Sequence, residues 1–140
     1  MRAITSLAAS LLLVLGVTAC SKSTTSPSTT TTTTATSPTT MTFASQLAFR
    51  GNTSRAFIVS TAGTIKVTLA TLGNGTVKVG LGIGVPTTAA PCSLTQSVVT
   101  ASGSTPQIAA NADAGVYCVQ VFDTGGLAED TPFSITVEHP

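Results

Sequence analysis

Few side chains in this sequence of 140 residues are suited to acid–base or nucleophilic chemistry. Paired carboxylates hydrolyse glycosides, but Glu129 and Asp130 are adjacent in a predicted loop, where neighbouring side chains tend to diverge. A Ser-His-acid triad needs a firmly held base, and the single histidine is the second-last residue, where chains usually fray. We therefore predict that the protein is not an enzyme. The acidic residues and the histidine are Asp113, Asp123, Glu129, Asp130, Glu138 and His139.

Three aspartates are the candidates for a metal site. Calcium takes oxygen ligands from loops, so Asp113, Asp123 and Asp130 would have to converge on one edge of the fold. The alternative is that these aspartates stabilise turns by accepting hydrogen bonds from nearby backbone. We favour the second interpretation and predict no metal and no cofactor. A histidine-rich metal site is excluded because there is one histidine.

Composition excludes several kinds of partner. Charged residues make up 8% of the chain and the formal net charge is +1, whereas an ordinary domain has about 25% charged residues. A nucleic-acid binder needs a basic face to neutralise phosphates, so nucleic acid is not an expected partner. Carbohydrate-binding sandwiches usually use flat aromatic platforms, and this chain has no tryptophan and one tyrosine. A weak protein-binding or structural role remains compatible with its neutral, threonine-rich composition.

The N-terminus has the pattern of an export signal. After Met1 and Arg2, an apolar run of eleven residues extends from Leu7 to Val17. This run is shorter than the ~20 residues of a membrane-spanning helix and has the length of a secretion signal's hydrophobic region. The sequence Val-Thr-Ala-Cys that ends at Cys20 resembles the lipobox of bacterial lipoproteins. The alternative is an ordinary secretion signal that contains a cysteine.

The lipobox resemblance implies where the chain is cut and where it resides. Residues 1–19 become a lipoprotein signal peptide, and Cys20 becomes the acylated N-terminus of the mature chain. Two or more acyl chains hold a protein stably on a membrane, so the membrane is the partner of this anchor. Ser21, in place of aspartate, favours transfer to the outer membrane of a two-membrane bacterium, on its periplasmic or surface side.

The next segment, residues 20–41, is predicted to be a disordered tether. It consists almost entirely of serine, threonine and proline, and it has too little apolar area to offset the entropy of ordering a backbone. A plain spacer is the favoured interpretation. A stalk with O-linked sugars is the alternative, since this composition suits such modification.

Residues 42–140 show the period of two that is typical of strands. Apolar residues alternate with polar or small ones in runs around Ile65, Leu81, Val119 and Ile135, and no stretch has a sustained helical period. Two further candidates lie at positions 43–49 and 56–60, and weaker ones lie near positions 94–100 and 107–110. About seven or eight short strands in this length indicate an all-β fold, an antiparallel β-sandwich of jelly-roll type.

Glycines punctuate this pattern in two ways. Gly73, Asn74 and Gly75 separate two strong strands and predict a tight hairpin, because these residues tolerate a positive φ. Glycines at 80, 82 and 84 alternate within one strand, which leaves no side chains on one of its faces. We expect a neighbouring segment to pack closely there. A ligand lying against the bare backbone is the alternative.

Two cysteines remain once Cys20 is assigned to lipid. Cys92 and Cys118 form an even pair in a chain predicted to enter an oxidising compartment. We predict a disulfide between them, and the alternative is a pair of buried free thiols. Their separation of 26 positions corresponds to about 3.5 kcal/mol of stabilisation in the chain-entropy treatment.

Three segments resemble the bacterial pre-peptidase C-terminal (PPC) domain, a small β-sandwich appended to secreted peptidases. They are Gly-Thr-Ile-Lys-Val-Thr-Leu at 63–69, Ala-Gly-Val-Tyr-Cys-Val-Gln-Val at 114–121 and Phe-Ser-Ile-Thr-Val at 133–137. The family's Ala-Gly-x-Tyr-x-x-x-Val signature falls on Ala114, Gly115, Tyr117 and Val121. Its usual Asp-x-Asp-x-x-Leu run is absent, since positions 77–83 hold no carboxylate.

These expectations combine into one functional hypothesis. The protein is a lipid-anchored, exported β-sandwich with a non-catalytic binding or structural role in the cell envelope. An accessory role beside a secreted peptidase, which the PPC resemblance implies, is the alternative, and a hydrolase is the third hypothesis.

Overall fold

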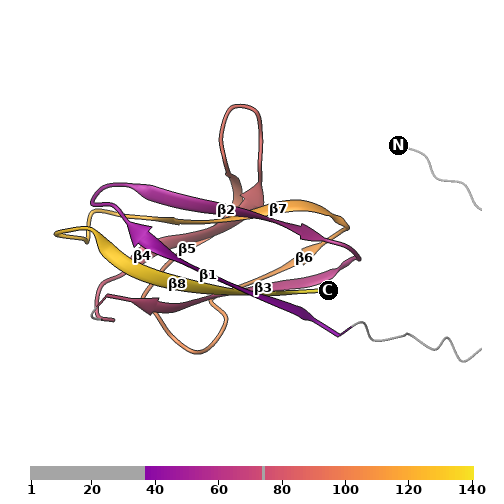
Figure 1. Cartoon of the computed structure of the whole chain (residues 1–140), viewed down its shortest axis with the longest axis horizontal. Coiled ribbons are helices and arrows are strands. Elements are labelled where there is room, and N and C mark those ends of the chain that lie inside the picture. The colour runs from indigo at the N-terminus through magenta and orange to yellow at the C-terminus, as the bar shows by residue number, and fades with distance from the viewer. Residues whose placement is uncertain (1–36, 74) are drawn as a thin grey trace, which may run out of the picture. The chain divides into compact units, whose positions relative to one another are not determined.

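The alternating pattern folds into an all-β body (Figure 1). The structure is a computed structural model, and it describes residues 37–73 and 75–140. Residues 1–36, which include the predicted signal peptide, Cys20 and most of the predicted tether, lie outside the described residues. Eight strands are formed within the described ranges: β1 (Thr39–Leu47), β2 (Asn52–Val59), β3 (Gly63–Leu72), β4 (Val79–Val85), β5 (Ser93–Thr100), β6 (Ile108–Ala112), β7 (Gly115–Phe122) and β8 (Thr131–His139).

The strands form two four-stranded antiparallel sheets. The first sheet has the order β1-β8-β3-β6, and the second sheet has the order β2-β7-β4-β5. Eight strands that alternate in this way between two sheets form a jelly roll, which contains two Greek keys. The predicted fold class, a β-sandwich of jelly-roll type with seven or eight strands, is therefore confirmed.

One face of each sheet is buried against the other. In β3, Ile65, Val67 and Leu69 are fully buried, and the residues between them are exposed or half-buried. The same alternation places Ile135 and Val137 of β8 in the core. A residue period of two puts alternate side chains on opposite faces of a strand, which is why the apolar residues of these runs all reach the interior.

The predicted hairpin between β3 and β4 is wrong. These two strands lie in different sheets, so the connection around Gly73 and Gly75 crosses from one sheet to the other. Both glycines do adopt a positive φ, of 43° and 79°. Turn residues are compatible with a hairpin, but both flanking runs have a buried face, and in a sandwich two such faces are buried against each other across the core.

The first strand begins earlier than the predicted end of the tether at residue 41. β1 starts at Thr39, which pairs with His139 of β8. Threonine is β-branched and favours extended backbone, and β8 continues far enough to pair with these first residues. Thr39, Thr40 and Met41 therefore belong to the folded body.

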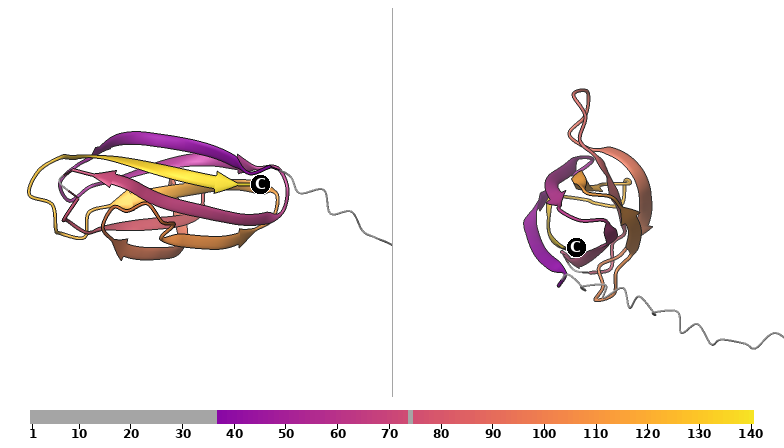
Figure 2. Two further views of the ribbon diagram at one scale, coloured as in Figure 1. Left: turned by 90° about the horizontal axis from the view of Figure 1, so that it is seen from below. Right: turned by 90° about the vertical axis from the view of Figure 1, so that its right-hand side faces the viewer.

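The connections gather at distinct places on the body. The β1–β2, β3–β4 and β7–β8 connections meet at one end, where Gly73 N–H donates to Pro132 and Asp123 N–H donates to Gly51, both at 2.9 Å. The first described residues and the C-terminus lie at the other end (Figure 1). The β4–β5 connection projects from the body, as Figure 1 and the right-hand view of Figure 2 show.

Candidate functional site

Asp123 organises the end of the sandwich where three connections meet. It directly follows β7, and its Oδ1 accepts hydrogen bonds from the backbone N–H groups of Gly125, Gly126 and Leu127 at 2.8, 2.9 and 3.2 Å. Its Oδ2 accepts a fourth bond, from Arg50 N–H at 2.9 Å. The carboxylate thus shapes its own loop and joins that loop to the β1–β2 connection.

These hydrogen bonds change the acidity of Asp123. Desolvation raises the pKa of the carboxyl, but the backbone donors at Arg50, Gly125, Leu127 and Gly126 together outweigh it and hold the pKa below its ordinary value of 3.8. Hydrogen bonds to the charged form of a carboxyl stabilise that form. Asp123 is therefore a charged structural residue at neutral pH.

Asp130 supports the same connection from the other side. Its Oδ1 accepts a hydrogen bond from Phe49 N–H at 2.9 Å. Two carboxylates therefore hold consecutive amides of the β1–β2 connection, where Arg50 has a φ of 54°. A left-handed backbone at a residue other than glycine is uncommon and needs external support, and these two bonds supply it.

The three aspartates proposed as calcium ligands do not come together. Asp113 precedes β7 and Asp123 follows it, so the two are separated by a strand of eight residues, or roughly 26 Å. Within residues 37–73 and 75–140, no group of three or more histidine, cysteine or acidic side chains is placed to hold a metal ion. Asp123 instead has the turn-forming role that the sequence favours.

His139 is held more firmly than its position in the chain suggested. It is the last residue of β8, is 7% exposed and stacks on Phe57 with ring centroids 5.4 Å apart. Its Nδ1 is 2.9 Å from the carbonyl oxygen of Pro140. The expectation of a frayed terminus is wrong, because β8 remains paired with β1 up to this residue.

Glu138 and Glu129 make contacts that do not involve the side chain of His139. Glu138 projects from the opposite face of β8 and lies 3.7 Å from the Nζ of Lys66. Glu129 is exposed in the β7–β8 connection, and its carbonyl oxygen accepts a bond from the Thr131 hydroxyl. The side chains considered for catalysis are thus held by separate sets of contacts.

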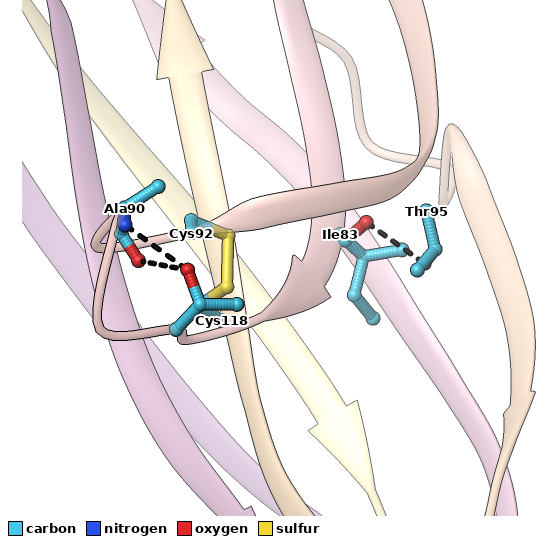
Figure 3. Close-up of a disulfide and its surroundings, with 6 residues drawn as sticks. Ile83, Ala90, Cys92, Thr95 and Cys118 are labelled. Atoms are coloured by element: carbon cyan, nitrogen blue, oxygen red, sulfur yellow. Dashed lines mark hydrogen bonds between the residues drawn. A yellow bond between two sulfur atoms is a disulfide. The ribbon is translucent and has the colours of Figure 1, made fainter.

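The predicted Cys92–Cys118 disulfide is present, with Cα atoms 5.6 Å apart (Figure 3). Cys118 lies in β7, Cys92 immediately precedes β5, and β4 separates these two strands in the second sheet. Strands two places apart are normally about 9.6 Å distant. The shorter distance means that the chain entering β5 crosses over the outer face of β4.

The alternating glycines of β4 permit this crossing. A Cβ at Gly84 would overlap the backbone carbonyl of Ser93, and a Cβ at Gly82 would be 2.7 Å from Leu94 Cδ1. A Cβ at Gly80 would overlap the ring of Phe122. The expectation that a neighbouring segment packs on this bare backbone is confirmed, and the glycine face is covered by the protein itself.

Residues of the PPC-like signature serve the fold. The Tyr117 hydroxyl donates to the carbonyl oxygen of Asp113 at 3.1 Å, a bond that closes the corner before β7 in the manner of the tyrosine corners of other β-sandwiches. Gly115 begins β7, and Val121 is fully buried in the core. These positions encode a corner and a core strand.

A groove between β1 and β2 was not anticipated from the sequence. It has a volume of about 690 Å³ and is lined by residues 41–44 of β1 and 55–58 of β2. The guanidinium of Arg55 lies 5.9 Å from the centre of the Phe43 ring, which itself packs edge-on against Phe133. The signal available in the sequence was Arg55. It occupies a core-facing position of β2, on the side of the strand where Phe57 and Val59 are buried.

No protein-family model matches this chain, and no curated protein shows significant sequence similarity to it. The resemblances to bacterial lipoproteins and to the PPC domain therefore stay predictions. Within the part of the chain that the structure describes, no helix is long and apolar enough to cross a membrane.

Proposed function

We propose that this protein is a lipid-anchored module of the bacterial cell envelope with a non-catalytic binding or structural role. One observation supports the non-catalytic part of this proposal. Each side chain that could perform acid–base or nucleophilic chemistry is held in its own structural contact, away from the others. Asp123 and Asp130 accept backbone hydrogen bonds, His139 is buried against Phe57, and the two described cysteines are joined in a disulfide. General acid–base catalysis needs such groups within reach of one substrate.

The disulfide supports the exported part of the proposal. Structural disulfides persist in oxidising compartments outside the cytosol. The lipobox resemblance at Cys20 supplies the anchor, and Ser21 favours the outer membrane. The serine- and threonine-rich segment then separates the sandwich from the lipid headgroups.

A screen for turnover tests the non-catalytic role. The purified full chain in detergent is assayed against panels of peptide, ester and glycoside substrates, beside the variants His139→Ala and Glu129→Gln. We expect no turnover that distinguishes the three proteins. Turnover that either substitution abolishes would establish a hydrolase instead.

Recovery of partners from solubilised envelope separates a binding module from a peptidase accessory. The tagged full chain is isolated under mild detergent, and the proteins that accompany it are identified by mass spectrometry. Enrichment of an envelope protein without peptidase activity supports the proposed role. Enrichment of a secreted peptidase would replace it with the accessory role that the PPC resemblance implies.

A further inference from the structure

Among the described residues, the two strands that border the β1–β2 groove are each paired along one edge only. β1 pairs with β8 and β2 pairs with β7, and these are their partners among the described residues. The edges meet near their shared connection, where the Thr53 hydroxyl donates to the carbonyl oxygen of Gln46 at 3.2 Å. Figure 1 shows the strands apart toward the other end. Within the part of the chain that the structure describes, N–H and C=O groups without a strand partner therefore border the groove.

β1 lacks the features that usually protect an edge strand. Natural sheets protect their edges with charged side chains, proline or bulges. The nine residues of β1, Thr-Thr-Met-Thr-Phe-Ala-Ser-Gln-Leu, contain no charge and no proline, and their register with β8 is uninterrupted. An exposed edge of this length is a template to which another extended segment can add through main-chain hydrogen bonds.

The groove beside this edge has an apolar floor and one charge. Met41 and Phe43 are half-buried and pack against the core, and Phe57 is buried. Arg55 is the one charged residue among those that line the groove. Its guanidinium lies over Phe43, and it makes no ion pair within residues 37–73 and 75–140.

We propose that the β1 edge binds an extended peptide segment of a partner protein, with apolar side chains in the groove and one carboxylate on Arg55. Strand addition gives affinity through the backbone and specificity through alternate side chains. An arginine binds a carboxylate with two parallel hydrogen bonds, so an acidic residue flanked by β-branched residues fits this site. The inference rests on the proposed binding role and is independent of the lipid anchor.

A synthetic peptide tests this site directly. The probe is the acetylated and amidated nonapeptide Thr-Val-Thr-Val-Thr-Glu-Thr-Val-Thr with a fluorescent label, and its control carries glutamine in place of glutamate. Binding to the full chain in detergent is measured by fluorescence anisotropy. We expect the glutamate peptide to bind at least about tenfold more tightly than the glutamine peptide, since hydrogen bonds between charged groups differ from neutral ones by about this factor.

Substitution of Arg55 completes a double-mutant cycle. Arg55→Gln should weaken binding of the glutamate peptide by a similar factor and remove the preference for glutamate. Lys66→Gln, which removes a cation from the outer face of the first sheet, should leave both affinities unchanged. An unchanged melting temperature shows that Arg55→Gln is folded, and hydrogen exchange on the wild-type complex should show new protection in β1.

Several outcomes would overturn the inference. These are no binding of the glutamate peptide at millimolar concentration, equal affinity for both peptides, and protection that appears away from β1. Self-association of the chain through β1 that excludes the peptide would assign the edge to a second copy instead. A chain that is acylated and shows no turnover can still fail to bind the peptide. That result overturns the proposed peptide partner and leaves the proposed function standing.

Discussion

The outer faces of the two sheets are built in opposite ways. On the first sheet, Thr42, Thr136 and Thr68 lie side by side in register, and Lys66 pairs with Glu138 in the neighbouring row. On the second sheet, the outward positions of β2, β7 and β4 contain no charged residue. Their centre is a line of glycines covered by Phe122, Leu94 and the chain that leads into β5.

The outer face of a sheet in a sandwich can therefore be exposed to water or be covered by another segment of the same chain. The first sheet meets water directly, with hydroxyl pairs such as Thr71 and Ser134 at 2.8 Å. The second sheet is covered by its own chain, which the disulfide holds in place. The covering extends to a part of the face only, since Ile58 and Val116 are register partners that remain 67% and 51% exposed.

Removal of the disulfide should have the largest effect on this contrast. The double variant Cys92→Ala with Cys118→Ala frees the segment that covers β4. We expect a loss of about 3.5 kcal/mol in the free energy of unfolding, from the loop-closure entropy of the unfolded chain. Denaturant titration of the full chain measures it. A loss below about 1 kcal/mol would mean that the covering segment holds its place without the bond.

A methyl group on the glycine line should have the next largest effect. Gly84→Ala forces the added Cβ against the backbone of Ser93, and we expect a loss of about 1–3 kcal/mol from overpacking. Gly82→Ala meets the side chain of Leu94, which can rotate, so its loss should be smaller. Thr68→Ala on the first sheet is the matched control and should change stability by less than ~0.5 kcal/mol. Equal losses of stability in all three variants would show that the outer face of the second sheet is no more tightly packed than that of the first sheet.

Acid should weaken the end of the second sheet through protonation of Asp123. The pKa of Asp123 is lowered in the folded chain by its four backbone donors. A lowered folded pKa gives stability that is complete above the unfolded pKa and is lost as the pH falls through the folded one. The melting temperature of the wild type should therefore fall more steeply below pH 4 than that of Asp123→Asn. Parallel curves would show that these bonds do not favour the charged form.

The smallest effect is expected from the ion pair on the first sheet. Lys66 and Glu138 are about half exposed and 3.7 Å apart, and such surface pairs contribute about 0–1 kcal/mol. Lys66→Gln should lower the melting temperature slightly at low salt and have no effect at 1 M salt, where exposed charges are screened. A large, salt-independent loss would show that the polar face depends on this pair.

Much of the fold was predictable because its signals are local. The period of two in β3, β7 and β8 identified strands and their buried faces, and the even pair Cys92 and Cys118 identified the disulfide. The alternating glycines of β4 indicated close packing. Each of these inferences depends on what a short stretch of backbone can accommodate.

Long-range pairing was not predictable in the same way. The Gly73–Gly75 segment signals a turn in any context, but whether β4 pairs with β3 or crosses to the other sheet depends on the competition of all eight strands for partners. The groove at Arg55 arises from two edges that separate after a shared connection. The burial of His139 depends on how far β8 pairs with β1. The pairing of β4 and the burial of His139 have no signature within one segment, and the local sign of the groove is limited to an arginine at a core-facing position of β2.

The anchor at Cys20 is the central claim, and mass spectrometry of the chain's N-terminal peptide tests it most directly. The full chain is expressed in a two-membrane bacterium and purified from its membranes. We predict a peptide that begins at Cys20 and carries acyl groups on that residue, and no such product from Cys20→Ser. A chain that retains residues 1–19, or one that begins elsewhere with an unmodified Cys20, would contradict the proposal of a lipid-anchored envelope protein.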